Sequence, residues 1–113
     1  MTLRKVITLF LTFIAFSSFA ENRADLAWQK VEQGALLVDV RTPQEFETQH
    51  LESALNFPLN TVNVAFNNID KDRDIVVYCR SGNRSGQAER YLKQIGFTNV
   101  HNGGGMEELI AAK

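Results

Sequence analysis

The residues around Cys79 are the ones in this sequence whose types and spacing can do chemistry. The cysteine ends an apolar run and is followed by a polar loop made of Arg80, Ser81, Gly82, Asn83, Arg84 and Ser85. It is the single cysteine among 113 residues, so the chain offers it no disulfide partner. The reactive form of a cysteine is the thiolate, and neighbouring arginines or a helix N-terminus lower the pKa of the thiol. The loop therefore predicts a thiolate nucleophile that forms without a histidine base.

The glycine within this loop adds a second prediction. A loop that leaves a strand and opens a helix can direct several backbone N–H groups into one concavity, which binds anions. We expect this nest to hold the Cys79 thiolate and to receive an anionic substrate beside Arg80 and Arg84. A cysteine that merely packs in the core is the alternative, but such a residue gains nothing from two guanidinium groups nearby.

Strands and helices that alternate along the chain must position the loop. Apolar runs rich in strand-forming residues predict strands at residues 35–40, 54–59, 74–79 and 97–101. Pro58 limits the second of these to an edge or an end of the sheet. We expect helices at residues 25–33, after the capping box Thr42–Glu45, after the Cys79 loop, and at 106–112, with a further short helix within 61–69.

Within the helix after the loop, Ala88, Tyr91, Leu92 and Ile95 share one face and are expected to point inward. Gly103 to Gly105 are read as a turn before the last helix.

This alternation predicts an α/β fold, with a mostly parallel sheet covered by helices on both faces. Ligands bind such sheets at the carboxyl ends of the strands. Cys79 ends one predicted strand, and Asp39 and Arg41 follow at the end of another. We expect these two residues to reach the same face near the Cys79 loop, more in a structural role than in direct catalysis.

The first 20 residues read as a cleaved signal peptide, with Arg4 and Lys5 before a 14-residue uncharged stretch and small residues at Ser18 and Ala20. One small domain, residues 21–113, then remains for the exported, periplasmic chain. Without Arg4 and Lys5, 10 basic residues face 13 acidic ones, a net charge of about −3. This balance argues against binding to nucleic acid or an anionic membrane, since both need a basic excess.

The Cys79–Ser85 segment resembles the active-site loop of rhodanese-type sulfurtransferases. Residues 36–59 are similar to the first signature of that family, a strand ending in Asp-x-Arg, a Pro-x-Glu-Phe helix and a histidine-containing segment. Residues 102–106 resemble its glycine turn before the last helix. Two positions depart from the pattern, because Gln49 and Ser53 stand where the family usually has glycine.

The resemblance implies a single rhodanese-like domain and a specific reaction. The Cys79 thiolate would attack the outer sulfur of thiosulfate, release sulfite, and pass sulfur from a persulfide to cyanide or a thiol. Arg80 to Ser85 would bind the substrate, Asp39 would orient the site, and Arg41 would pair with a carboxylate. Ser85 is equally suited to capping the helix. No cofactor or metal is implied, and we expect a monomer.

Two other functions compete with this one. The related cell-cycle phosphatases share the fold but have five residues between cysteine and arginine, whereas Cys79 and Arg84 enclose four. A shorter loop suits one sulfur atom better than phosphate or arsenate. The other alternative is a non-catalytic module, or a carrier whose persulfide serves one partner protein.

Overall fold

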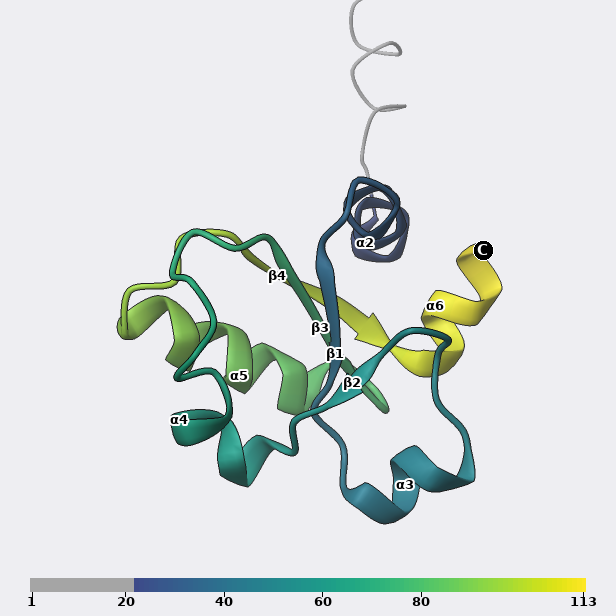
Figure 1. Cartoon of the computed structure of the whole chain (residues 1–113). Coiled ribbons are helices and arrows are strands. Elements are labelled where there is room, and N and C mark those ends of the chain that lie inside the picture. The colour runs from purple at the N-terminus through teal and green to yellow at the C-terminus, as the bar shows by residue number, and fades with distance from the viewer. Residues whose placement is uncertain (1–21) are drawn as a thin grey trace, which may run out of the picture.

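A four-stranded parallel sheet lies at the centre of the protein, whose computed structural model describes residues 22–113 (Figure 1). The strands are β1 (Leu36–Asp39), β2 (Leu55–Asn56), β3 (Ile75–Cys79) and β4 (Val100–Gly105). Their order across the sheet is β2-β1-β3-β4. The signal peptide expected at residues 1–20, with its cleavage site after Ala20, lies outside the described residues.

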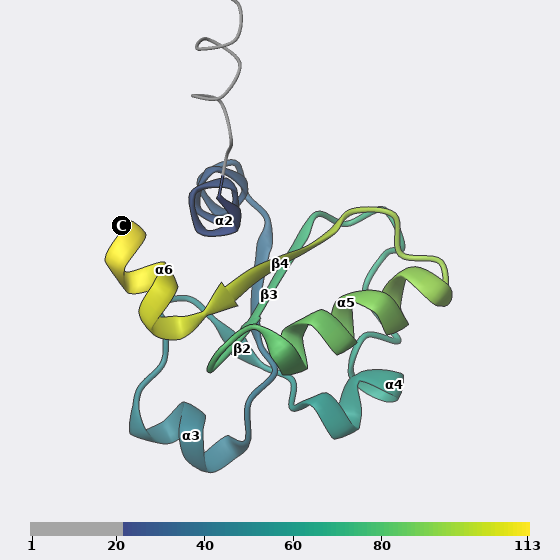
Figure 2. The ribbon, with the colours of Figure 1, turned by 180° about the vertical axis from the view of Figure 1, so that it is seen from behind.

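Helices cover both faces of this sheet, as Figures 1 and 2 show from opposite sides. The short η1 (Leu59–Thr61), α4 (Val62–Ala65) and α5 (Asn83–Gln94) lie on one face, while α2 (Arg23–Glu32) and α6 (Met106–Ala112) lie on the other. Helix α3 (Pro43–Thr48) follows the carboxyl end of β1. The predicted α/β class and the covering of both faces are confirmed.

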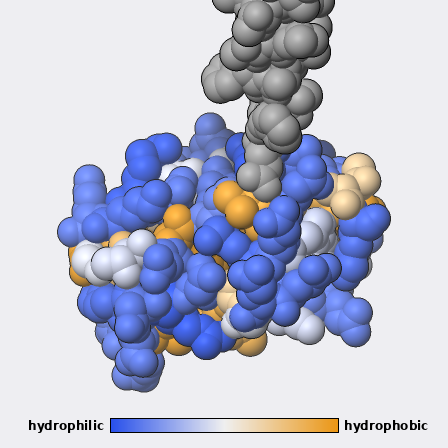
Figure 3. All heavy atoms as spheres, turned by 90° about the horizontal axis from the view of Figure 1, so that it is seen from above, coloured by the Kyte–Doolittle hydropathy of each residue, from blue (hydrophilic) through white to orange (hydrophobic). Residues whose placement is uncertain are grey.

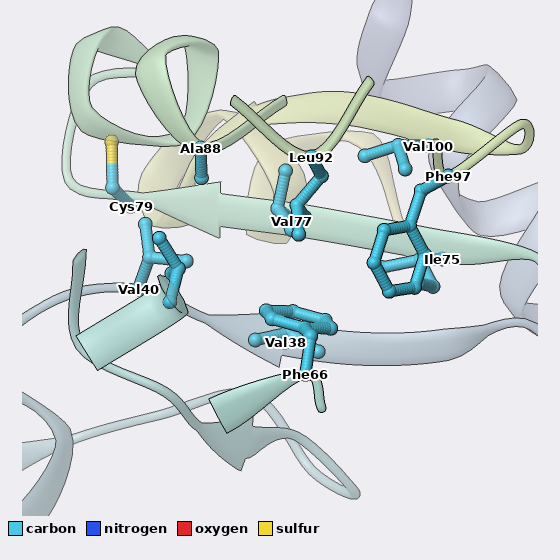
Figure 4. Close-up of a cluster of buried hydrophobic side chains, with 11 residues drawn as sticks. Val38, Val40, Phe66, Ile75, Val77, Cys79, Ala88, Leu92, Phe97 and Val100 are labelled. Atoms are coloured by element: carbon cyan, nitrogen blue, oxygen red, sulfur yellow. The ribbon is translucent and has the colours of Figure 1, made fainter. Parts of the chain in front are cut away.

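Alternation along the central strands explains why two separate cores form. Val77 and Cys79 face α5 and pack with Ala88 and Leu92, as Figure 4 shows. Val76 and Tyr78 point to the opposite face, toward α2 and α6. Successive side chains of a strand point to opposite faces, so a strand buried on both sides is apolar throughout. All five residues of β3 are buried, as the continuous apolar run predicted.

The capping box at the start of α3 is confirmed in full. The Thr42 side chain accepts a hydrogen bond from the Glu45 N–H, and the Glu45 carboxylate accepts one from the Thr42 N–H. Pro43 occupies the first turn, where its missing N–H costs nothing. This local geometry places Glu45 on the side of α3 that faces α5, to which it is ion-paired through Arg84.

Four expectations about elements differ from the structure. Gly103 to Gly105 form no turn, because β4 continues through them in parallel pairing with β3, past an irregularity in register between Val77 and Tyr78. The second strand shrinks to Leu55–Asn56, and the helix expected at 61–69 is only η1 followed by α4. Ile95 is 39% exposed, because α5 ends at Gln94 and the next residue turns away from its inner face.

The end of the molecule at which α2 lies is largely hydrophilic in Figure 3, with hydrophobic side chains in small, separate groups. Scattered apolar residues of this kind are normal on a folded domain. Within residues 22–113, no helix is both long enough and apolar enough to cross a bilayer.

Candidate active site

Cys79 is the last residue of β3 and lies at the carboxyl edge of the sheet, where the site was expected. Its partner in β4 is Gly105, directly before α6, and its neighbour Tyr78 pairs with Asp39 at the end of β1. The three strand ends therefore bring Asp39, Cys79 and the start of α6 together. The thiol is 1% exposed, and Figure 4 shows its sulfur directed toward the α5 side of the sheet.

Hydrogen-bond donors of the following loop surround the Cys79 sulfur. The backbone N–H of Gly82 donates to Sγ at 3.0 Å and that of Ser85 at 3.4 Å. The Ser85 Oγ lies 3.3 Å from the same sulfur. Gly82 has φ +100°, a left-handed conformation that glycine adopts without strain, and this conformation turns the chain from the loop into α5. The predicted nest is therefore present.

Two opposing effects set the pKa of the Cys79 thiol. Burial is the larger single influence and raises the pKa, because it disfavours the charged form. Hydrogen bonds from the Ser85 hydroxyl and from the N–H groups of Ser85, Gly82 and Ser81 act against it, and the net result is a lowered pKa. The expected direction is confirmed, but hydrogen bonds rather than arginine charges are the main influences that lower it.

Arg84 is engaged by a carboxylate that the sequence did not assign to it. Its Nη1 and Nη2 donate to the two oxygens of Glu45 at 2.8 and 3.1 Å, in a bidentate pair that joins α5 to α3. The pair lowers the pKa of Glu45 to about 2, with the Arg84 hydrogen bonds as the main cause. Arg80, by contrast, is an exposed residue of the loop itself.

Asp39 and Arg41 form a buried ion pair next to the loop. The Arg41 Nη2 lies 2.7 Å from Asp39 Oδ2, its Nε donates to the same carboxylate, and its Nη2 also reaches the Gln49 carbonyl at 2.6 Å. Asp39 is 0% and Arg41 5% exposed. The carboxylate expected for Arg41 is thus Asp39 itself. Removal of either partner would leave a buried charge unpaired, so the pair holds the end of β1 in place.

A pocket of about 420 Å³ opens at this edge of the sheet. Its walls are formed by Arg41, Glu45, Thr48, Gln49, Arg80, Met106 and Glu107. The lining residues thus come from the chain after β1, from α3, from the loop after β3 and from the start of α6. Cys79 directly precedes Arg80 in the chain and is not itself among the residues that line the pocket.

The family follows from a comparison with known proteins. Residues 23–112 match the rhodanese-like domain. The chain belongs to the rhodanese family. Its match covers nearly all of the described residues, including the Cys79 loop and the residues that line the pocket.

Named relatives place this rhodanese among the sulfurtransferases. The thiosulfate sulfurtransferase PspE of Escherichia coli K12 is 37% identical over 78 residues, 67% of this chain and 75% of that protein. The thiosulfate sulfurtransferase GlpE of Pseudomonas syringae is 40% identical over 78 residues, 69% and 74% of the two chains.

Solved structures of rhodanese-type proteins are also similar to this chain. A structure described as rhodanese with anions from E. coli has a TM-score of 0.61 and 36% identity, and covers 66% of this chain and 91% of that one. A human single-domain sulfurtransferase, 22% identical with a TM-score of 0.70 over 79% of this chain and 92% of its own, shares the fold.

The remaining predicted residues of the rhodanese loop have distinct positions. Ser85 does not cap α5, since Gly82 occupies the cap position and no side chain caps it. The Asn83 side chain accepts a hydrogen bond from Gln87, on the outer surface of the helix. The Ser81 carbonyl accepts one from Arg23 of α2 at 3.2 Å. Within residues 22–113, no three His, Cys, Asp or Glu side chains gather as a metal site.

Sequence reasoning missed two supports of the rhodanese loop. Asn102 of β4 contacts both Ser85 and Gly82, and Arg23 of α2 is ion-paired with Glu108 of α6 while holding the Ser81 carbonyl. The signal for Asn102 was a polar side chain within an otherwise small and apolar strand end. Arg23 and Glu108 carried no such signal, because they lie 85 positions apart.

Proposed function

We propose that this rhodanese is a thiosulfate sulfurtransferase in which Cys79 carries the transferred sulfur. The thiolate attacks the outer sulfur of thiosulfate, a bond forms from Sγ to that sulfur, and the S–S bond of thiosulfate breaks. Sulfite leaves with the electron pair. Cyanide or a thiolate then attacks the outer sulfur of the persulfide, takes that sulfur, and regenerates the Cys79 thiolate.

The observation that carries this proposal is the set of donors around a buried sulfur. The N–H groups of Gly82 and Ser85 stabilise an ionised Cys79 at the end of β3. Fixed donors of this kind need no reorganisation when charge develops. Sulfite is a good leaving group, so the reaction needs no general acid, in keeping with a loop that holds no histidine.

Arg80 supports the choice of an anionic sulfur donor. It is an exposed cation on the wall of the pocket beside Cys79, whereas Arg41 and Arg84 are already paired with carboxylates. Phosphate or arsenate chemistry would need the Arg84 guanidinium fork for the substrate oxygens, and Glu45 occupies that fork. The geometry therefore favours sulfur transfer over the oxyanion alternative.

Intact mass spectrometry of the reduced, purified protein tests the proposal. Thiosulfate should add about 32 Da to the wild type, and cyanide should remove the addition with release of thiocyanate. Cys79→Ser should gain nothing. The absence of an adduct on a demonstrably reduced Cys79 would contradict the proposed donor, and turnover of a phosphate ester by the same protein would favour the rival chemistry.

A kinetic comparison separates the free enzyme from a carrier that serves one partner protein. Steady turnover with thiosulfate and cyanide is expected for the enzyme, while a stable persulfide that cyanide discharges only slowly would indicate the carrier. We also propose that the mature protein is an exported, periplasmic monomer that needs no cofactor.

A further inference from the structure

The orientation of the Asn102 amide is fixed by its neighbours. Its Oδ1 accepts hydrogen bonds from the Ser85 hydroxyl at 2.7 Å and from the Gly104 N–H at 3.0 Å, while its Nδ2 donates to the Gly82 carbonyl at 3.1 Å. A flipped amide would set two donors against each other at Gly104 and two acceptors at Gly82. Asn102 therefore presents only an acceptor to Ser85.

The Ser85 hydroxyl has a single hydrogen and two neighbours that can accept it. Its Oγ lies 2.7 Å from the Asn102 Oδ1 and 3.3 Å from the Cys79 Sγ. Since the amide oxygen cannot donate, the hydrogen at the shorter contact must come from Ser85. The hydroxyl can then accept from a neutral Cys79 thiol, but it can donate to a thiolate only by leaving Asn102.

We propose that Asn102 is a positioning residue that competes with the Cys79 sulfur for the one hydroxyl hydrogen of Ser85. When Cys79 is neutral, this hydrogen points to Asn102, and when Cys79 is ionised, it turns to Sγ. Asn102 thereby keeps the resting thiol less acidic than the loop alone would make it. The inference rests on the proposed role of Cys79 as the nucleophile.

The charged groups around the sulfur are held independently of position 102. Arg84 from α5 is paired with Glu45 of α3, and Arg23 from α2 is paired with Glu108 of α6. Both arginines interact electrostatically with Cys79. Arg80 follows Cys79 in the loop itself. Asn102 is uncharged, so its removal changes none of these charges and its effect must pass through hydrogen bonds.

A double-mutant cycle on the full chain tests the proposal. Cys79 is the single cysteine, so the ultraviolet absorbance of the thiolate, corrected with Cys79→Ser, reports its titration alone. Asn102→Ala should lower the apparent pKa of Cys79 by about 0.5 to 1 unit, the size of one hydrogen bond. Ser85→Ala should raise the pKa, and adding Asn102→Ala to Ser85→Ala should leave it unchanged.

The sign of the shift separates this role from simple support of the loop. If Asn102 only holds the loop in shape, its loss misaligns the N–H donors and raises the pKa in both backgrounds, which overturns the proposal. An unchanged pKa in Asn102→Ala, measured on protein shown to be folded by its thermal unfolding, overturns it as well.

A second variant keeps the test decisive if Asn102→Ala does not fold. Asn102→Asp offers Ser85 a stronger acceptor. It should therefore raise the pKa of Cys79 more in the wild-type background than in the Ser85→Ala background. Equal increases of the Cys79 pKa in the two backgrounds would contradict the proposed competition for the Ser85 hydrogen. Since the titration does not depend on sulfur transfer, failure of the persulfide experiment would leave this result standing, and the two proposals can fail separately.

Discussion

Removal from solvent on its own would keep the Cys79 thiol neutral, so its acidity depends on what replaces the water. Two backbone N–H groups and one hydroxyl lie within 3.4 Å of the sulfur, and they outweigh burial. Neither arginine of the loop donates a hydrogen bond to the sulfur in the described structure. Arg84 joins two helices through Glu45, and Arg80 remains exposed on the pocket wall.

Ser53 is a single residue in a conformation suited to glycine, with φ +73°. The left-handed region strains a residue with a Cβ, so we expect Ser53→Gly to raise the free energy of unfolding by up to about 1 kcal/mol. The gain is reduced because glycine also adds conformational entropy to the unfolded chain. Chemical denaturation measures the change. Ser53→Ala keeps the Cβ and should give no such gain, and equal effects of the two variants would contradict the strain.

The sequence predicted which residues form the site better than it predicted their partners. Cys79, its loop, and the Asp39–Arg41 spacing were found from local patterns, and the resemblance named Ser53 as a position where glycine is usual. The partner of Arg84 was not found, because Glu45 lies 39 positions away and already had a local explanation in the capping box. Local signals do not state which distant side chains meet.

The Glu45–Arg84 pair ties α3 to α5 and should make stability depend on pH. The pKa of Glu45 is lowered to about 2, so its stabilisation is fully present above the unfolded carboxyl pKa of about 4.3 and is lost as the pH falls through about 2. Glu45→Gln keeps the means to cap the helix but loses the charge. We expect it to lower the free energy of unfolding by about 1 kcal/mol at neutral pH.

Denaturation at several pH values checks this dependence. The difference between wild type and Glu45→Gln should shrink between pH 4.3 and about 2, as the wild-type carboxylate becomes protonated. Glu47→Gln, an exposed change on the same helix, serves as the matched control. A difference that stays constant with pH would assign the loss to capping and not to the ion pair.

The hydrophobic periodicity of the sequence predicted the types of the elements correctly, but it did not predict where the strands end. The apolar run of β3 and the inner face of α5 at Ala88 and Leu92 were correct. The three glycines at 103–105 suggested a turn because local propensity cannot register pairing with a neighbouring strand. They instead extend β4 by pairing with the end of β3. Gly105 is required there because a Cβ would collide with the Arg80 carbonyl.

Across the full fold, the site draws on segments from both ends of the described chain. Arg23 near its start is ion-paired with Glu108 near its end and donates to the Ser81 carbonyl of the loop. Asn102 of the last strand reaches Ser85 of the helix before it. The ends of β1, β3 and β4 carry the site residues, and Asn56 at the end of β2 donates to the carbonyls of Asp39 and Arg41, so the site exists only when the sheet is complete.

Processing of the chain can be tested on the intact protein from its native compartment. We expect N-terminal sequencing of the exported form to begin at Glu21, since Ser18 and Ala20 supply the small residues that a signal peptidase needs. Sedimentation of that form should give the mass of one copy. An N-terminus upstream of Glu21 would contradict cleavage after Ala20.

The distant origin of the donors around Cys79 has a consequence for the chain before it folds. Gly82 and Ser85 lie close to Cys79 in sequence, but β4 and α2 contact their loop from distant parts of the chain, through Asn102 and Arg23. An unfolded chain lacks these contacts and carries a thiol of ordinary acidity. Before the chain folds, the cysteine is therefore no more prone to oxidation than any other, and its reactivity arises only once the last strand has joined the sheet.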